Sequence, residues 1–471
     1  MNMADTGHAN TNATTVFCGT LVHSTASKPL DVLGNFAIGF EHRNGKILFI
    51  TPESDLDEEL RTRCLSADCV TYLTDFQFLM PGLVDTHIHA PQYVYAGTAL
   101  DLPLLDWLNK YTFPVEAQYK DIKFASEAYR RVVKRTLASG TTTALYFATL
   151  HKEASLKLAE IAVELGQRAF VGKVNMDQNS PDYYVETTEQ SLKDTEWFVK
   201  QVQALQNPLV QPVVTPRFAP SCSSTLMKGL ADIAKKHQLH VQSHISENID
   251  EVEWVKELFP QCENYTDVYD KHGLMTDKTV MAHCIYLDDG EIDVFKNHGT
   301  AMSHCPCSNF SLRSGVMDSR KMIDHGVKVG LGTDVSGGYS PSMLNAIQNC
   351  VTASNTISIM EQLKQRKNYQ HLQFAEAFKL ATLGGCEALG ISDTVGNFEV
   401  GKEFDALLVN LKPSDSPLDV FQTEQYSDSK EDMIQKFIFL GDDRNIQEVY
   451  VKGRRVKPFS DDAANGTAKK V

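Results

Sequence analysis

The sequence predicts an α/β protein built around a (β/α)8 barrel of the TIM type, with a small flanking β domain formed by both termini. Three observations support this fold class. In the central part of the chain, short apolar runs alternate with segments of helical periodicity. Eight such runs can be counted, and apolar strands alternating with helices are typical of buried parallel strands. Runs of β type also occur near both ends of the chain, outside this repeat.

The flanking runs are separated by polar breaks such as Arg43-Asn44-Gly45. They are Val16–Leu21, Phe36–Phe40, Lys46–Ile50, Asp405–Leu411 and Glu448–Val451. We expect residues 1–78 and 386–459 to pair into one β domain and residues 79–385 to form the barrel. Residues 460–471 are small and polar, and we expect them to be a flexible tail.

The eight central runs are the expected barrel strands. They are Leu79–Val84, Thr142–Phe147, Ala169–Val174, Val210–Pro216, Leu239–Ser243, Thr279–Ala282, Thr300–Ser303 and Val327–Gly332. The expected helices between them include Ala125–Ala138, Glu153–Leu165, Leu226–His237 and Glu291–His298. The carboxyl ends of barrel strands meet on one face, so polar residues that follow these runs are expected to share a site.

Composition and charge narrow the classes of partner. The 471 residues include 45 Lys and Arg against 60 Asp and Glu, a formal net charge of −15. Such an acidic surface repels nucleic acid and anionic lipid, so we expect neither as a partner. The first fourteen residues lack a secretory signal pattern, and no apolar stretch has the length of a membrane span. The ten cysteines are scattered, which favours reduced thiols and a cytoplasmic protein.

Histidines and an aspartate follow several of the predicted strands. His87 and His89 follow the first, and residues two apart on a strand point to the same side. His244 follows the fifth strand, His283 the sixth and Asp334 the eighth. Imidazole nitrogens with a carboxylate are a ligand set for a divalent metal. In this arrangement His283 is either a further ligand or a hydrogen-bond partner of the reactive water.

Other polar residues near these strand ends have two interpretations each. Glu247 is either a first-turn helix acid, favoured by the helix dipole, or a carboxylate that moves protons beside the metal. The order of the site favours the second. His304, after the seventh strand, is either a site residue or a packed strand-end histidine. The remaining histidines are expected to be exposed or held by local hydrogen bonds, among them His151, His237, His240, His272 and His298.

These residues carry a resemblance to a known family. The stretch Pro81–His89, with histidines on strands five and six and an aspartate on strand eight, resembles the metal-dependent amidohydrolase superfamily. Within it, longer stretches resemble the guanine deaminases, and the likeness runs from about residue 15 to residue 459. Those stretches are His89–Tyr93, Asp101–Leu105, Tyr111–Pro114, Thr215–Phe218, Gln242–Asn248, Gly332–Gly338 and Gly396–Ala406.

The resemblance implies hydrolysis of guanine to xanthine and ammonia by a homodimer, with one Zn²⁺ per subunit and Fe²⁺ as the less favoured metal. It implies that His87, His89, His244 and Asp334 hold the metal and that Glu247, Asp334 and His283 are catalytic. A single metal is expected, because Thr215–Arg217 stands where two-metal relatives carry a bridging lysine.

We expect the substrate to contact Glu247 and three of the metal ligands, His89, His244 and Asp334. We also expect contacts from Arg217, Phe218 and Gln92. Arg217 has only donors, so it suits the O6 or N7 acceptor of guanine and would reject adenine. Its alternative is a salt bridge on the barrel rim. Phe218 either stacks on the purine or packs as an ordinary aromatic residue, and Gln92 offers both a donor and an acceptor.

Three other functions compete with this interpretation. The same metal set could serve a hydrolase of another amino- or chloro-substituted heterocycle. The barrel could also be a scaffold without catalysis, although the His, Asp and Glu set argues against that. A deaminase of the cytidine type needs His-x-Glu with Pro-Cys-x-x-Cys, and the chain has no such pattern.

Overall fold

The computed structural model describes residues 14–365 and 368–459, which fall into two compact units. One unit combines the residues up to Gly82 with those from Asp393 onward, and the other is Leu83–Ser392. The sequence analysis drew these borders at residues 79 and 386. Its predicted tail, residues 460–471, lies outside the described residues.

The first unit is a β sheet whose strands come from both ends of the chain, as predicted. Along the sheet the order is β16-β15-β14-β5-β1-β2-β3, with β4 beside β1. β14 pairs antiparallel with β5, so the C-terminal strands continue the N-terminal sheet without a break. The strands are β1 (Thr14–His23), β2 (Asp31–Glu41), β3 (Ile47–Pro52), β4 (Val70–Tyr72), β5 (Gln77–Pro81), β14 (Ala406–Asn410), β15 (Ile446–Val451) and β16 (Arg454–Lys457). The helices of this unit are α1 (Leu56–Thr62) and α16 (Lys430–Leu440).

An aromatic cluster forms the core of this unit. Phe404, just before β14, stacks on Phe40 of β2 with ring centroids 4.0 Å apart, and both side chains are fully buried. Phe17 and Tyr450 pack on the same pair of rings. Stacked aromatic pairs stabilise a core beyond the area they bury. This cluster therefore ties the C-terminal segment to the N-terminal strands.

The second unit is the predicted (β/α)8 barrel. Among the described residues its eight strands pair in parallel in the order of the chain, from β6 to β13. The last strand lies against the first: the Thr86 hydroxyl donates to the Leu331 carbonyl, and the Asp334 N–H donates to the His87 carbonyl. The strands are β6 (Leu83–His89), β7 (Thr141–Phe147), β8 (Arg168–Asn175), β9 (Val210–Pro216), β10 (His240–Ile245), β11 (Thr279–His283), β12 (Ala301–His304) and β13 (Val329–Leu331).

The predicted first barrel strand, Leu79–Val84, is wrong because it joins two strands of different sheets. Residues up to Pro81 belong to β5, which pairs with β14, while β6 begins at Leu83. Between them the Gly82 N–H donates to the Asp405 carbonyl. Both halves of the run are buried. Hydrophobicity alone therefore gives no sign of the change of sheet.

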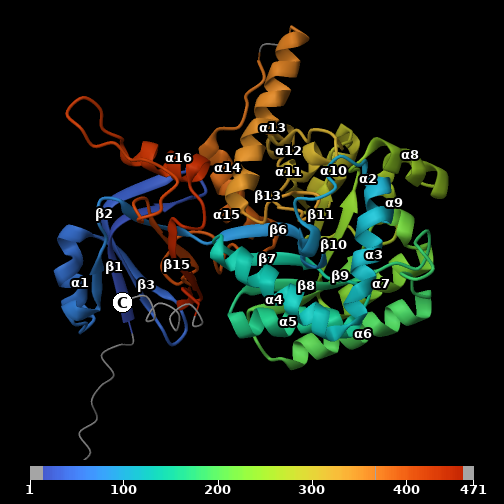
Figure 1. The fold of residues 1–471 in the computed structure, drawn as a ribbon, viewed down its shortest axis with the longest axis horizontal. Coiled ribbons are helices and arrows are strands. Elements are labelled where there is room, and N and C mark those ends of the chain that lie inside the picture. The colour runs from blue at the N-terminus through green and yellow to red at the C-terminus, as the bar shows by residue number, and fades with distance from the viewer. Residues whose placement is uncertain (1–13, 366–367, 460–471) are drawn as a thin grey trace, which may run out of the picture. The chain divides into compact units, whose positions relative to one another are not determined.

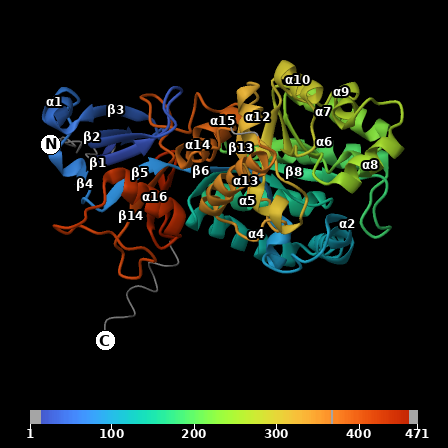
Figure 2. The ribbon, with the colours of Figure 1, turned by 90° about the horizontal axis from the view of Figure 1, so that it is seen from above.

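Helices lie outside the barrel strands (Figures 1 and 2). In α4 one face is buried, with Ala125, Tyr129 and Val132 among its buried residues, and Asp121 caps its N-terminus through the N–H groups of residues 123 and 124.

None of the described helices combines the length and apolar character needed to cross a membrane. The helices of this unit are α2 (Leu104–Trp107), α3 (Phe113–Ala117), α4 (Ile122–Ala138), α5 (Lys152–Leu165), α6 (Thr188–Ala204), α7 (Ser224–His237), α8 (Ile249–Leu258), α9 (Tyr265–Lys271), α10 (Asp289–His298), α11 (Pro306–Ser311), α12 (Ser319–Asp324), α13 (Met343–Leu363), α14 (Phe374–Leu380) and α15 (Leu383–Ala388).

Candidate active site

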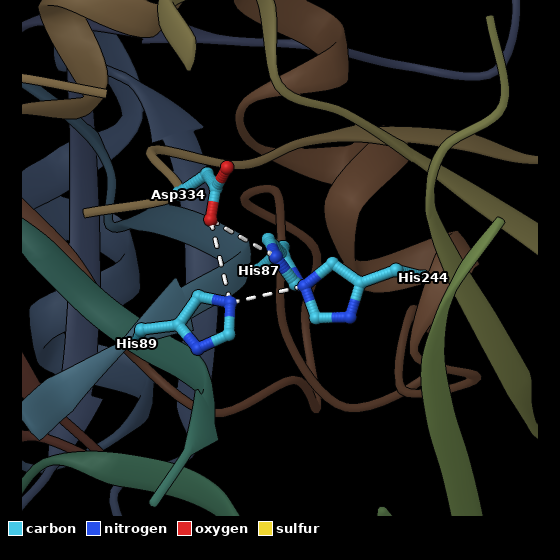
Figure 3. Close-up of side chains that lie close together, drawn as sticks. All are labelled: His87, His89, His244 and Asp334. Carbon is cyan, nitrogen blue, oxygen red and sulfur yellow. Dashed lines mark hydrogen bonds and ion pairs between the residues drawn. The ribbon is translucent and has the colours of Figure 1, made fainter. Parts of the chain in front are cut away.

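Four side chains from three parts of the barrel converge at the carboxyl ends of its strands (Figure 3). His87 and His89 come from β6, His244 from β10, and Asp334 follows β13. One ligand atom of each lies within 4.8 Å of the others. Asp334 Oδ1 is 3.2 Å from His87 Nε2 and 3.5 Å from His89 Nε2, and the Nε2 atoms of His89 and His244 are 3.0 Å apart.

The spacing of these atoms fits a bound cation. Zinc–nitrogen bonds of about 2.0–2.1 Å in a tetrahedral site place ligand atoms roughly 3.3 Å from one another. His244 Nδ1 lies 2.6 Å from the Arg217 carbonyl, to which it can only donate, so its Nε2 carries the lone pair. His87 Nε2 is buried without a hydrogen-bond partner among the described residues. Nitrogen lone pairs that face each other without a proton are the donor set that a divalent metal requires.

Burial prepares these groups for metal binding. It lowers the pKa of His89 and His244 well below the usual histidine value. Both imidazoles are therefore neutral at pH 7, the state that ligates a metal. For Asp334, burial alone would raise the pKa, but the surrounding histidines outweigh it and hold the pKa below its ordinary value. Asp334 is thus an anion.

Two residues of the site have strained backbones. His283, the last residue of β11, has φ +75°, and Asp334 has φ +46°. Left-handed φ values cost energy in residues with a Cβ, and such strain clusters at functional sites. Here it aims both side chains into the barrel mouth, where His283 Nε2 lies 3.6 Å from Asp334 Oδ2.

Glu247 approaches the same nitrogen of His283, with 3.4 Å between its Oε2 and His283 Nε2. Burial raises its pKa well above the usual glutamate value, and the negative charges of Asp334 and Glu251 raise it further. Burial and these two charges therefore favour the protonated form of Glu247. A buried neutral carboxylic acid beside a reacting group can act as a general acid.

The N-terminal end of α8 fixes the position of Glu247. The Glu251 carboxylate accepts hydrogen bonds from the N–H groups of Glu247 and Asn248 at 2.9 and 3.2 Å, and from the Tyr265 hydroxyl at 2.7 Å. Asn248 is the N-cap of the helix and completes a capping box with Glu251. The proton-carrying side chain is thus attached to a rigid turn.

A pocket beside the four-ligand cluster could hold a substrate. Its polar lining includes Gln92, Arg217 and Glu247, and Phe218 contributes an aromatic face. Apolar side chains complete it, namely Leu104, Trp107, Leu108 and Leu312. A cleft in which polar groups converge beside apolar side chains is typical of small-molecule sites.

Arg217 forms a buried ion pair with Glu116. Its Nη1 and Nη2 donate to the two oxygens of Glu116 at 2.7 and 3.1 Å, and both side chains are buried. Burial lowers the pKa of Arg217, but the charge of Glu116 and its hydrogen bonds outweigh this and raise it. The salt bridge that the sequence analysis considered as an alternative is therefore present. Its arginine lines the pocket, and both partners are buried instead of lying on the rim.

Comparison with known proteins agrees with this geometry. The sequence profile of the amidohydrolase family matches residues 78–456. The chain belongs to the amidohydrolase family. It is 53% identical over 447 residues to the guanine deaminase of Mus musculus, covering 94% of this chain and 97% of the relative. It is 47% identical over 455 residues to the guanine deaminase of Dictyostelium discoideum, covering 94% and 98%.

A solved structure of this family is also similar. The crystal structure of guanine deaminase from C. acetobutylicum with bound guanine in the active site matches with a TM-score of 0.84 at 38% identity. The match covers 94% of this chain and 99% of that one. The fold class and the family predicted from the sequence are confirmed.

The remaining histidines of this amidohydrolase lie apart from the cluster. His304 is buried, and neither ring nitrogen has a hydrogen-bond partner among the described residues. It belongs to none of the possible metal-ligand groups found in the described ranges. The other five each have a hydrogen-bond or ion-pair partner, which is local in sequence only for His272: His151, His237, His240, His272 and His298.

Sequence reasoning missed two residues that hold others in place. Glu116 binds Arg217, and Asn309 Oδ1 lies 2.9 Å from His283 Nδ1. Glu116 stands three residues after Phe113 on α3, but nothing in the sequence marks either residue as a partner of Arg217. The Phe113 ring lies under the Arg217 guanidinium, 5.3 Å from centroid to Cζ.

Proposed function

We propose that this chain is a zinc-dependent hydrolase that converts guanine and water to xanthine and ammonia. The observation that carries the proposal is the four-ligand cluster beside a pocket that presents an arginine, a glutamine and a neutral carboxylic acid. Relatives that are 53% and 47% identical over nearly the whole chain are guanine deaminases, which supports the choice of substrate.

His87, His89, His244 and Asp334 would hold a single Zn²⁺. Three imidazoles and one carboxylate also suit Fe²⁺, which is the less favoured metal. Bound there, zinc would supply a water of lowered pKa, about 7 instead of 15.7 in bulk, and so a nucleophile at neutral pH.

The chain's own residues would move the protons. Asn309 Oδ1 accepts from His283 Nδ1, so His283 Nε2 keeps its lone pair and, with Asp334, orients the attacking water toward the ring carbon that bears the amine. Glu247 donates its proton to the ring nitrogen N3. After receiving a proton from the water, it passes this to the leaving amine, which departs as ammonia. Such shuttling contributes about 10²–10⁴-fold to a rate.

Recognition of guanine would use the edge of the base that adenine lacks. The N–H groups of Arg217 that do not bind Glu116 can donate to the O6 acceptor. The Gln92 side chain is held in one orientation, because its Nε2 donates to Glu116 and its Oε1 accepts from the Ser336 N–H. Phe218 would pack on the purine plane. A site that hydrogen-bonds a specific edge discriminates by about 10⁴–10⁵-fold.

Further parts of the proposal rest on the family resemblance. We infer that the enzyme acts as a homodimer in the cytoplasm, without nucleic acid or membrane as partner. Its ten cysteines are all free, which suits a reducing compartment, and its net charge of −15 disfavours anionic partners.

The test is xanthine formation from guanine before and after treatment with a chelator. We expect chelation to remove activity by more than about 100-fold and added Zn²⁺ to restore it, because the metal supplies the nucleophile. Metal analysis should give one ion per subunit. The Glu247→Gln variant should keep the metal and lose turnover by about 10²–10⁴-fold.

Two outcomes would contradict the proposal. Turnover of guanine that is insensitive to chelation would remove the metal from the mechanism. Ammonia release from another purine, a pyrimidine or a triazine in preference to guanine would support the competing hydrolase of a different heterocycle.

A further inference from the structure

One buried carboxylate lies at the centre of the substrate pocket's polar residues without belonging to the metal cluster. Glu116, on α3, is fully buried. Its Oε1 accepts from Gln92 Nε2 at 3.0 Å and from Arg217 Nη2 at 3.1 Å. Its Oε2 accepts from Arg217 Nη1 at 2.7 Å and from the Tyr184 hydroxyl at 2.8 Å. Four hydrogen bonds therefore end on this one carboxylate.

Two of the three side chains that bind Glu116, Arg217 and Gln92, line the pocket and would face the edge of a bound purine. A guanidinium and an amide on single bonds have many rotamers, and fixing a side chain costs about 0.5–1.5 kcal/mol when it happens on binding. Here the fork-shaped pairing with Glu116 and the Phe113 ring hold Arg217 in place before any ligand arrives. Gln92 is held at both ends, by Glu116 and by the Ser336 N–H.

Charge is the second consequence of this pairing. Arg217 is a permanent cation in a site with almost no contact with water, and an unpaired buried charge is strongly unfavourable. Glu116 neutralises it. The guanidinium then offers directed N–H donors without a net charge that would favour anions.

We propose that Glu116 is a specificity-determining positioning residue, which holds Arg217 and Gln92 in the orientation that reads the 6-oxo edge of a neutral purine. The inference rests on the proposed function. Glu116 does not line the pocket and does not belong to the metal cluster, so it acts through Arg217 and Gln92.

The test is the Glu116→Gln variant, assayed with guanine and with 2-aminopurine, which keeps the reacting amine but lacks the 6-oxo group. An amide cannot accept all four hydrogen bonds, so Arg217 and Gln92 lose their fixed orientation. We expect KM for guanine to rise about 10- to 100-fold while kcat falls less than about 5-fold. Selectivity for guanine over 2-aminopurine should fall by about 10-fold, a change that a merely structural role would not produce.

Glu291→Gln is the matched control. Glu291 is another buried carboxylate of the barrel that accepts hydrogen bonds, from Thr266, but it lies outside the pocket. It should lower stability without changing KM or selectivity. When Arg217 is already replaced by Met, Glu116→Gln should change KM and selectivity much less than it does in the wild type, because the arginine that Glu116 positions is gone.

Three outcomes would overturn the inference. If the wild type does not deaminate guanine, the proposed function fails and this inference falls with it. If the wild type acts on guanine and Glu116→Gln keeps its KM and selectivity, only the inference fails. If Glu116→Gln does not fold, Tyr184→Phe removes one of the four hydrogen bonds and should raise KM about 3-fold, and an unchanged KM would contradict the role.

Discussion

Glu247 and Asp334 are both carboxylic acids in the same pocket, yet their pKa values shift in opposite directions. Burial raises the pKa of Glu247, and the negative charge of Asp334 adds to it. For Asp334 burial acts in the same direction, but the neighbouring histidines outweigh it. Because their pKa values shift in opposite directions, the two carboxyl groups provide one proton donor and one anion. Acid–base chemistry at neutral pH requires this division of roles. At this scale the environment, more than the residue type, sets the function.

His304 gives a prediction of pH dependence at the same scale. Burial lowers its pKa to about 3, whereas an unfolded histidine titrates near 6.5. Between these values the unfolded chain binds a proton that the folded protein does not, so the free energy of unfolding falls as the pH falls. Between pH 7 and pH 5, we expect the free energy of unfolding to fall by about 2 kcal/mol less in His304→Gln than in the wild type.

Urea unfolding of both proteins at the two pH values measures this difference. His298→Gln is the control, because His298 is a half-exposed histidine paired with Asp270. Parallel stability profiles for His304→Gln and the wild type would show that the buried imidazole is protonated in the folded state.

Among the elements, the short ones decide the geometry of the site. α3 has only five residues, yet it supplies both Glu116 and Phe113 to Arg217. Glu251, in the first turn of α8, accepts a hydrogen bond from the Glu247 N–H and so holds this residue in place. Long barrel helices such as α4 bury one face and contribute no residue to the pocket. The long elements build the scaffold and the short ones orient the reacting groups.

The turn before α8 gives the element-scale prediction. In Glu251→Gln the side-chain N–H₂ would face N–H and O–H donors, so at least one hydrogen bond is lost in a buried place. We expect the free energy of unfolding to fall by about 1–3 kcal/mol, and kcat to fall because Glu247 is displaced. Urea unfolding and steady-state kinetics measure the two effects. A variant that loses stability but keeps kcat would show that the turn does not position Glu247.

For the molecule as a whole, the site lies within a single unit. Every metal-ligand candidate and every pocket residue belongs to Leu83–Ser392. The other unit is joined from both ends of the chain through β5 and β14 and through the stacked rings of Phe40 and Phe404. Stability of the β unit and chemistry of the barrel should therefore respond to different substitutions.

Phe404→Ala tests this separation. Removing a fully buried ring leaves a cavity and typically costs about 3–5 kcal/mol. We expect a marked fall in the unfolding midpoint, with metal content and KM of the folded protein unchanged. Tyr72→Ala, at an exposed aromatic of the same sheet, is the control with little expected change. A large change in KM in Phe404→Ala would show that the β unit shapes the pocket.

Local patterns along the chain predicted the alternation of strands and helices and the sheet built from both termini. They also predicted that strand-end histidines and Asp334 would gather, whereas the family resemblance was needed to choose four of these residues as metal ligands. These features are local: apolar periodicity reports burial, and strand ends of a parallel barrel meet on one face whatever the rest of the chain does. His87, His89, His244 and Asp334 each follow or end a strand, so their convergence follows from topology.

The pairing of polar groups with each other is known only from the folded molecule. Glu116 and Arg217 stand 101 positions apart, and no pattern in either segment names the other as its partner. The boundary between β5 and β6 was likewise invisible, because strands of both sheets are buried. Hydrophobicity records whether a residue is buried, whereas the identity of its neighbours depends on how distant segments pack, and that is settled only when the chain is folded.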